Sequence, residues 1–204
     1  MGGEPGVSAR LAARVRRWFT GLGFSQMRQL AVLLVLAVTA FFGGLDSANT
    51  KVTVFEPGDE FGDGQYTLSV DRASMLDKIT AGTRVVLPDN PDRRYLAVVA
   101  NLTNDGHVPG NLSKVFDLVG QPEKRFVGAY RIADSTSNWW LGPGLSDTFA
   151  FIWELPDADL TPGEAVTLRV WKKKFTELSV TYGQSWIDSV TEYGEITVPV
   201  RERS

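Results

Sequence analysis

One apolar segment divides this chain into two parts of different character. Residues 30–45 contain no charged side chain, and Asp46 ends the segment. Glu4 is the only acid before it, whereas the same stretch contains five arginines: Arg10, Arg14, Arg16, Arg17 and Arg28. A basic segment followed by an apolar one is typical of an export signal or a single-span anchor whose basic side stays in the cytoplasm. We therefore expect a basic cytoplasmic leader at residues 1–28, a transmembrane signal anchor at 29–45 and an extracytoplasmic domain at 46–204, in a single-pass protein of the cell membrane.

The apolar segment has two interpretations, an uncleaved anchor and a cleaved signal peptide. As a helix, its residues rise about 24 Å, against a hydrocarbon core of about 30 Å, and upstream aromatic residues such as Trp18 and Phe19 extend it. Cleavage after Ala40 would leave two phenylalanines at the new N-terminus, and cleavage after Ala48 would place Asp46 three residues before the cut. Because neither cleavage site is good, we favour the anchor, with a secreted protein as the alternative.

The remainder of the chain has the size of one ordinary domain and an acidic surface. Its 159 residues are enough to bury a stable core without disulfides or bound metals. The chain contains no cysteine, which excludes both disulfides and the acylated cysteine of a lipoprotein. Of the 21 basic and 24 acidic residues, 16 basic and 23 acidic ones follow residue 45, so this part carries a net charge of about −7. This balance argues against a nucleic-acid partner.

Apolar residues after residue 50 repeat with a period of two, which predicts strands and not helices. Apolar and polar side chains alternate in Tyr66–Val70, and turn-forming residues such as Pro88-Asp89-Asn90-Pro91 separate the apolar runs. The expected strands cover residues 52–55, 66–70, 83–87, 95–104, 114–119, 124–130, 147–155, 165–171 and 195–200. Many short strands separated by turns predict an all-β sandwich, with Trp153 and Trp171 in its core and one helical turn at Met75–Lys78.

The order of these elements also carries a resemblance. Asn101-Leu102-Thr103-Asn104-Asp105-Gly106 ends a long apolar strand, Phe116-Asp117-Leu118 follows, and Leu141-Gly142-Pro143-Gly144 precedes the strand at 147–155. Pro162-Gly163-Glu164 then introduces the strand at 165–171. Over residues 64–175 the chain resembles the immunoglobulin-like extracytoplasmic domains of unknown function found on bacterial, especially actinobacterial, lipoproteins and single-span proteins. The resemblance implies an immunoglobulin-like β-sandwich outside the membrane and supplies no catalytic residues.

The residues that carry catalytic or metal chemistry are sparse. His107 is the only histidine, and without cysteine it does not make a zinc or copper site. The acidic turn Asp59–Gly64 lacks the spacing of a calcium-binding loop and is interpreted as a solvated turn. No nucleophile motif or phosphate-binding loop is present. We therefore predict no catalytic residues, no metal and no cofactor, and an envelope hydrolase is the third-ranked function.

Aromatic residues in polar surroundings are the candidate binding residues. Trp139 and Trp140 stand between a Ser/Thr/Asn-rich stretch and Gly142-Pro143-Gly144, and Tyr182 and Trp186 lie in an insertion after the lysine run 172–174. An indole in a polar loop offers a large, stiff contact area. The sequence thus predicts a membrane-anchored binding or accessory domain of the cell envelope. It contacts lipid through residues 29–45 and an envelope protein or a glycan through these aromatics; a carbohydrate-binding module is the alternative.

Overall fold

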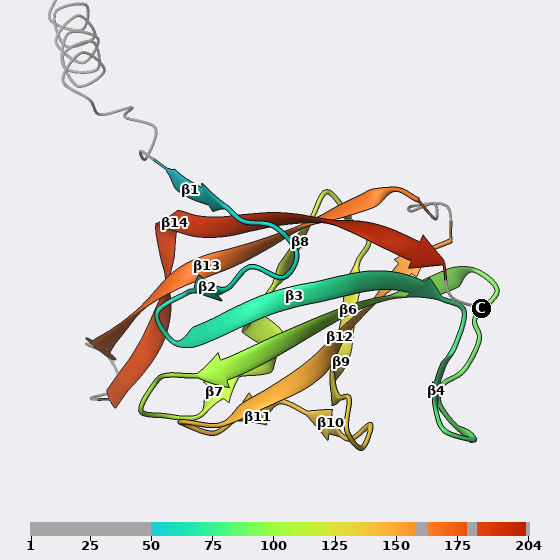
Figure 1. Ribbon diagram of the computed structural model, residues 1–204, viewed down its shortest axis with the longest axis horizontal. Coiled ribbons are helices and arrows are strands. Elements are labelled where there is room, and N and C mark those ends of the chain that lie inside the picture. Colours follow the sequence, from blue (N-terminus) through green and yellow to red (C-terminus); the bar gives the residue numbers. More distant parts are fainter. Residues whose placement is uncertain (1–49, 158–162, 179–182, 203–204) are drawn as a thin grey trace, which may run out of the picture. The chain divides into compact units, whose positions relative to one another are not determined.

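The computed structural model describes residues 50–157, 163–178 and 183–202 (Figure 1). The expected leader at 1–28 and anchor at 29–45 lie outside the described residues. Among the residues that are described, no helix has the length and apolar character needed to cross a membrane. Fourteen strands and one short 3₁₀ turn, η1 (Leu112–Lys114), are found in the described part.

The strands are, in chain order, β1 (Lys51–Val54), β2 (Phe61–Gly62), β3 (Tyr66–Leu76), β4 (Ile79–Ala81), β5 (Arg84–Leu87), β6 (Arg93–Asn104), β7 (Gly110–Asn111), β8 (Asp117–Val119), β9 (Arg125–Arg131), β10 (Ser137–Asn138), β11 (Trp140–Leu141), β12 (Ser146–Pro156), β13 (Ala165–Leu178) and β14 (Gly183–Glu202).

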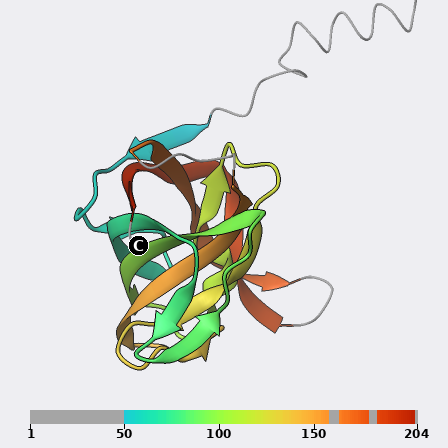
Figure 2. The same ribbon diagram turned by 90° about the vertical axis from the view of Figure 1, so that its right-hand side faces the viewer.

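Two layers of strands face each other across one core (Figures 1 and 2). Layer 1 contains β8, β13, β14 and β1, and layer 2 contains β10, β9, β12, β6 and β3, with β2 paired to β3. Strand β14 belongs to both layers, because it pairs with β13 along most of its length while Val200–Glu202 pair in parallel with Ala73–Met75 of β3. This arrangement confirms the expected all-β sandwich.

The core lies between the layers, where alternate residues of each strand point inward. Phe116 meets Phe151 edge-on, with ring centroids 4.8 Å apart, and Trp153 is only 3% exposed. The inward residues of the longest strands are Val166, Leu168 and Val170 of β13, Ile196 and Val198 of β14, Leu96, Val98 and Ala100 of β6, and Phe149, Phe151 and Trp153 of β12. Burial of large apolar side chains in this cluster is the main stabilising contribution to the fold.

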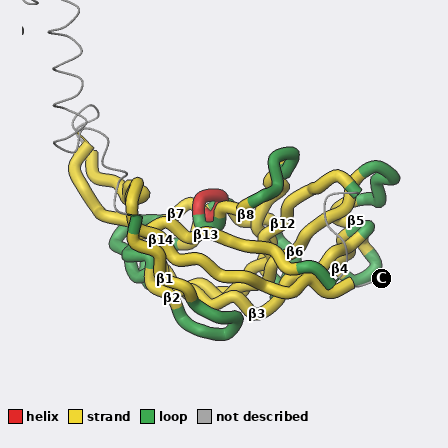
Figure 3. The backbone as a smooth tube through the Cα atoms, turned by 90° about the horizontal axis from the view of Figure 1, so that it is seen from above, coloured by secondary structure: helices red, strands yellow, loops and turns green. Residues whose placement is uncertain are grey.

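Strand β6 is buried on both faces over Tyr95–Ala100. Tyr95 and Ala97 point away from the main core, yet they are only 5% and 7% exposed. They form a second apolar cluster with Ile152 of β12, and Ile79 and Leu87 of the β4–β5 hairpin pack against it. The hairpin, which lies at the end of the sandwich near the C-terminus (Figures 1 and 3), therefore covers part of the outer face of layer 2.

Two local expectations are wrong. Residues 75–78 form no helical turn, because Met75 and Leu76 continue β3 and pair with Leu96 and Tyr95 of β6. Trp171 is not in the core, because alternation along β13 turns it to the outer face of layer 1. There its ring packs edge-on against Tyr193 with centroids 5.0 Å apart, and the guanidinium of Arg169 lies 5.3 Å from its centroid.

The insertion after the lysine run is not a loop but an extension of the sheet. Strands β13 and β14 remain paired as far as Leu178 and Gly183, after an irregularity between Trp171 and Lys173. We call residues 172–178 and 183–190 the arm. It extends from the body of the sandwich in Figure 2, and Phe175 and Trp186 pack together on it with centroids 5.2 Å apart.

Candidate functional site

Trp139 and Trp140 lie at one end of the sandwich, between β10 and β12. Trp140 belongs to β11 and pairs with Asn111 of β7, while the carbonyl of Trp139 accepts a hydrogen bond of 2.9 Å from the backbone N–H of Leu112. The exposed fractions are 48% for Trp139, 60% for Trp140 and 58% for the nearby Leu145. These residues are therefore exposed apolar groups on hydrogen-bonded backbone.

The two indoles do not form one flat platform. Consecutive residues of an extended chain point to opposite sides. Trp139 contacts Phe126 edge-on, with centroids 6.2 Å apart and ring planes at 79°. Each indole therefore presents its own apolar surface, and a sugar ring could not stack across both at once.

Asn104, at the end of β6, holds the backbone beneath the indoles. Its side-chain amide donates to the carbonyls of Leu141 and Val108 at 2.7 and 3.0 Å, and its Oδ1 accepts from the Gly106 N–H at 2.9 Å. Its own backbone N–H and carbonyl bond to Leu145 and Gly144. Because Asn104 is fully buried and its polar groups are bonded, it fixes the two loops that flank Trp140. The Asn101–Gly106 motif thus has a structural role here.

Trp186 attaches the arm to the same end of the sandwich. Its half-buried ring lies against Gly106 of the β6–β7 loop, so closely that a Cβ at Gly106 would stand 2.9 Å from the indole nitrogen. That nitrogen has no hydrogen-bond partner among the described residues. Trp186 therefore packs the arm against the loop that Asn104 organises. Tyr182, the fourth predicted binding residue, lies outside the described residues.

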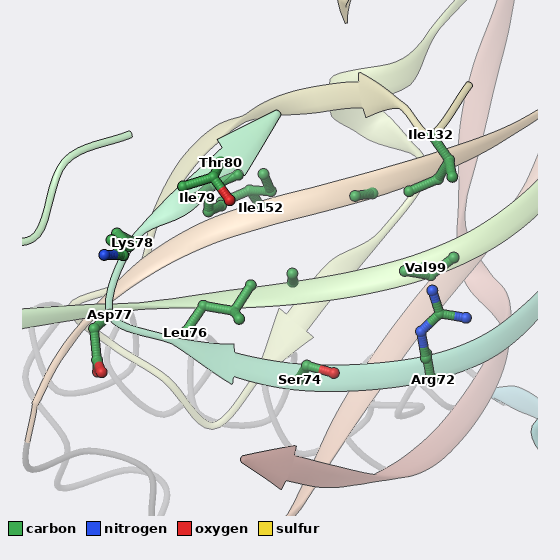
Figure 4. A pocket seen from close by; sticks show the side chains of 12 residues that line it. Arg72, Ser74, Leu76, Asp77, Lys78, Ile79, Thr80, Val99, Ile132 and Ile152 are labelled. Carbon is green, nitrogen blue, oxygen red and sulfur yellow. The ribbon is translucent and has the colours of Figure 1, made fainter. Parts of the chain in front are cut away.

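A groove of about 490 Å³ runs along the outer face of layer 2 (Figure 4). Leu76, Ile79 and Ile152 line one part of it, beside Lys78 and Asp77, and Val99, Ile132 and Arg72 line the other. The groove is the part of this apolar face that the β4–β5 hairpin leaves uncovered. Its lining combines apolar side chains with charges of both signs and favours no particular ligand.

The acidic turn at residues 59–64 is not the solvated turn expected from the sequence. Asp59 accepts a hydrogen bond from the Glu56 N–H at the surface, but Asp63 is fully buried and forms an ion pair with the buried Lys173 of β13. Burial, and secondarily the charge of the Asp63 carboxylate, raise the pKa of the neighbouring Tyr66 above its usual 10.0. The Tyr66 hydroxyl has no hydrogen-bond partner among the described residues.

The second buried carboxylate, Glu154 of β12, is also paired with bases. Its Oε2 accepts a hydrogen bond of 2.6 Å from Arg125 Nε, and Arg93 Nε lies 3.7 Å from Oε1. Burial, and then the Glu154 charge, raise the pKa of Tyr95 beside it. Asp63 and Glu154 are thus both paired with basic side chains.

No group of three metal-binding side chains comes together in the part of the chain that the structure describes. His107 lies exposed in the β6–β7 loop. The described residues include exposed aromatic side chains at one end of the sandwich and an apolar groove on layer 2.

Sequence reasoning missed both the groove and the Asp63–Lys173 pair. A signal for the groove exists in Tyr95–Ala100, where every residue is apolar, because a strand without alternation is covered on both faces. No local signal exists for the ion pair, since its members are 110 residues apart.

Comparison with known proteins gives structural neighbours but no family. No family model matches the chain, and no curated protein matches it. An uncharacterised β-sandwich protein of Clostridium difficile 630 is similar in structure, with a TM-score of 0.47 and 12% identity over 72% of this chain and 95% of that one. A conserved hypothetical protein of Bacillus anthracis has a TM-score of 0.35 and 12% identity over 56% of this chain and 87% of that one.

Proposed function

We propose that this protein is a binding domain of the cell envelope, anchored by residues 29–45 and without catalysis. In this proposal it recognises another envelope protein through the end that carries Trp139 and Trp140. The observation that supports it is the 48% and 60% exposure of two adjacent indoles on hydrogen-bonded backbone. Tryptophan is enriched among the few residues that contribute most of the binding energy at protein interfaces.

The rigidity of this end supports the proposal. Association costs conformational entropy wherever side chains and loops become ordered. The bonds of Asn104 to Gly106, Val108 and Leu141 order the backbone before any partner arrives. The loops beside the indoles are therefore pre-organised for contact.

A protein partner is favoured over a glycan, because the indoles point to different sides and are accompanied by Leu145. Sugar-binding sites stack the faces of sugar rings on aromatic planes, whereas protein interfaces accept separate aromatic and aliphatic anchors. A carbohydrate-binding module becomes the better interpretation if the wild-type protein sediments with isolated cell-wall glycan and the Trp140→Ala variant fails to sediment with it.

The family and the anchor are parts of the same proposal. The motif order from Asn101 to Gly163 supports membership of the immunoglobulin-like extracytoplasmic domains, and the two-layer fold agrees with it. The arginines before residue 29 support a cytoplasmic N-terminus. A reporter that is active only in the cytoplasm, fused after Ser204, should be silent. An active fusion would show that the C-terminal domain lies in the cytoplasm and would contradict the proposal.

Site-specific photo-crosslinking in cells tests the contact surface. The full chain would carry p-benzoylphenylalanine at Leu145, an exposed residue five positions after Trp140, or at Val190, an exposed residue of the arm used as the control. We expect a discrete protein adduct from position 145, its loss on Trp140→Ala, and no such adduct from position 190. Trp171→Ala, a tryptophan variant on the outer face of layer 1, should keep the adduct.

Two outcomes would contradict the proposal. The first is the absence of any protein adduct from position 145 in a chain that reaches the membrane. The second is an adduct that Trp140→Ala leaves unchanged, because the indole would then contribute nothing to the contact.

A further inference from the structure

The turn between β2 and β3 places two opposite charges together inside the protein. The side chains of Asp63 and Lys173 are 0% and 4% exposed, and Lys173 Nζ lies 2.7 Å from Asp63 Oδ2. Burying an ion pair costs desolvation that the mutual attraction only partly offsets. An amide formed between the two side chains would carry no charge and would remove this cost.

The backbone brings these two residues together independently of their charges. The Lys173 N–H donates to the Asp63 carbonyl at 2.6 Å. Gly64 has a φ of +111°, in the left-handed region that favours glycine, and a Cβ there would collide with the carbonyl oxygen of Lys173. The strand irregularity between Trp171 and Lys173 interrupts the regular pairing of β13 at the same point. Residues 63 and 173 are thus held in contact by main-chain geometry.

The remaining oxygen of Asp63 is placed as in an oxyanion hole. Asp63 Oδ1 accepts hydrogen bonds from the backbone N–H groups of Gln65 at 2.7 Å and Tyr66 at 2.6 Å. Two fixed N–H groups on one oxygen stabilise the negative charge that develops there when a nucleophile adds to the carboxyl carbon.

A proton carrier is also in place. Asp188 of β14 stands opposite Lys173 in the strand register, and its Oδ1 lies 3.6 Å from Lys173 Nζ. Its side chain is 43% exposed, so it joins the buried pair to solvent. Asp63 and Lys173 also line an open hollow of about 510 Å³ through which water can leave.

We propose that Lys173 and Asp63 condense to an intramolecular amide, a covalent crosslink between β13 and the β2–β3 turn. A proton first moves from the Lys173 ammonium to Asp63 Oδ2, which gives a neutral amine and a carboxylic acid. The Nζ lone pair then forms a bond to Asp63 Cγ, and the electron pair of the Cγ–Oδ1 double bond moves onto Oδ1, held by the Gln65 and Tyr66 N–H groups.

Loss of water completes the reaction. Asp188 takes a proton from the new C–N nitrogen and passes it to Oδ2, the Cγ–Oδ2 bond breaks with its electron pair, and Oδ2 leaves as water while the Cγ–Oδ1 double bond re-forms. An ammonium and a carboxylate become one secondary amide and one water, and Asp188 ends unchanged. Fixed contact between the reacting groups replaces the chemical activation that amide formation needs in solution.

Mass spectrometry of the full-length protein, purified in detergent and denatured, tests the proposal. We expect an intact mass about 18 Da below the sequence mass, the loss of one water. Trypsin does not cut after an acylated lysine, so the digest should contain residues 52–72 joined to residues 173–174. The sequence mass, with these two peptides separate, would overturn the proposal even if no variant folds.

Three variants locate the bond. Lys173→Met removes the nucleophile and should restore the full sequence mass. Lys172→Met is the matched control, because Lys172 Nζ bonds to the Gly62 carbonyl instead of a carboxylate, and it should keep the mass deficit. Asp188→Asn should slow formation, visible as a larger uncrosslinked fraction soon after synthesis. A deficit that survives Lys173→Met would assign the lost water elsewhere and overturn the proposal.

Discussion

The centre of the sandwich and its tryptophan-bearing end use aromatic residues in opposite ways. Trp153 and Phe151, on β12, are 3% and 0% exposed and lie among apolar side chains of both layers. Trp139 and Trp140, which precede β12 in the chain, are 48% and 60% exposed, on a backbone that Asn104 holds through hydrogen bonds. The centre is ordered by burial of apolar side chains, and the end is ordered by the hydrogen bonds of Asn104. Stability therefore depends mainly on the centre, whereas the exposed indoles can change without loss of the fold.

The largest effect is expected at the centre. Phe151→Ala should lower the free energy of unfolding by about 3–5 kcal/mol, because it removes a fully buried ring and leaves a cavity among Phe116, Phe149 and Trp153. Urea denaturation followed by circular dichroism measures this. A loss below about 1 kcal/mol would show that the centre is not the stabilising region and would break the comparison.

The next largest effect is expected at Asn104, whose hydrogen bonds order the tryptophan-bearing end. Asn104→Ala leaves the buried carbonyl of Leu141 and the Gly106 N–H without partners, so we expect a loss of about 1–3 kcal/mol. Hydrogen exchange should show increased opening of residues 105–109 and 141–145 before the centre opens. If the whole sandwich exchanged uniformly faster, the end would not be a separately ordered region.

A smaller effect of opposite sign is expected at Tyr66, whose buried ring lies against Gly110 of β7. Its hydroxyl has no partner among the described residues, so Tyr66→Phe should raise the free energy of unfolding by up to about 1 kcal/mol. The pKa of Tyr66 is raised in the folded state, so its contribution to stability is present below the unfolded value of 10.0 and lost as pH rises above it.

The variant should therefore gain further over the wild type at high pH. Urea titrations at about pH 8 and about pH 10.5 should show a larger difference at the higher pH. A variant that is less stable than the wild type at both pH values would show that the hydroxyl has a stabilising partner.

The smallest effect is expected at the exposed indole. Trp140→Ala should change the free energy of unfolding by no more than about 0.5 kcal/mol, because its ring is mostly in solvent. Thermal denaturation beside the crosslinking assay separates stability from contact. A loss of several kcal/mol in the free energy of unfolding would show that the ring packs in the interior. The end would then not differ from the centre in its use of aromatic residues.

The sequence predicts the long strands well because alternation is local. The apolar runs at Tyr66–Val70 and Phe149–Leu155 lie in β3 and β12, and the two-layer fold follows from them. Strands of two to four residues, such as β7 and β11, are too short to show a period. The apolar character of its strand wrongly predicts Trp171 to be in the core. Which face of the sheet a side chain lies on depends instead on its position in the alternation along the strand. The arm has lysines and polar residues where strands usually have apolar ones, and only the pairing between its two segments makes them strands.

The candidate contact surface could be predicted only in part. The polar, Gly/Pro-bounded setting of Trp139 and Trp140 indicated candidates for exposure, since it offers few apolar neighbours. The packing of Trp186 on Gly106 and the contact of Asp63 with Lys173 depend on pairings between distant parts of the chain. Such pairings follow from the tertiary fold and leave no pattern in a local window of sequence.

Strand β14 also determines when the protein can fold. Its residues pair with Lys51–Val54 of β1 and Ala73–Met75 of β3, so the first strands of the sandwich find their partners among the last. Contacts between residues so far apart in sequence form slowly, because the intervening chain must close into a long loop first. A growing chain that has emerged only as far as β13 still has β1 unpaired and one side of β3 open. Completion of the sandwich therefore waits for residues 192–202 of β14, and a chain released before that point exposes unpaired strand edges to its neighbours.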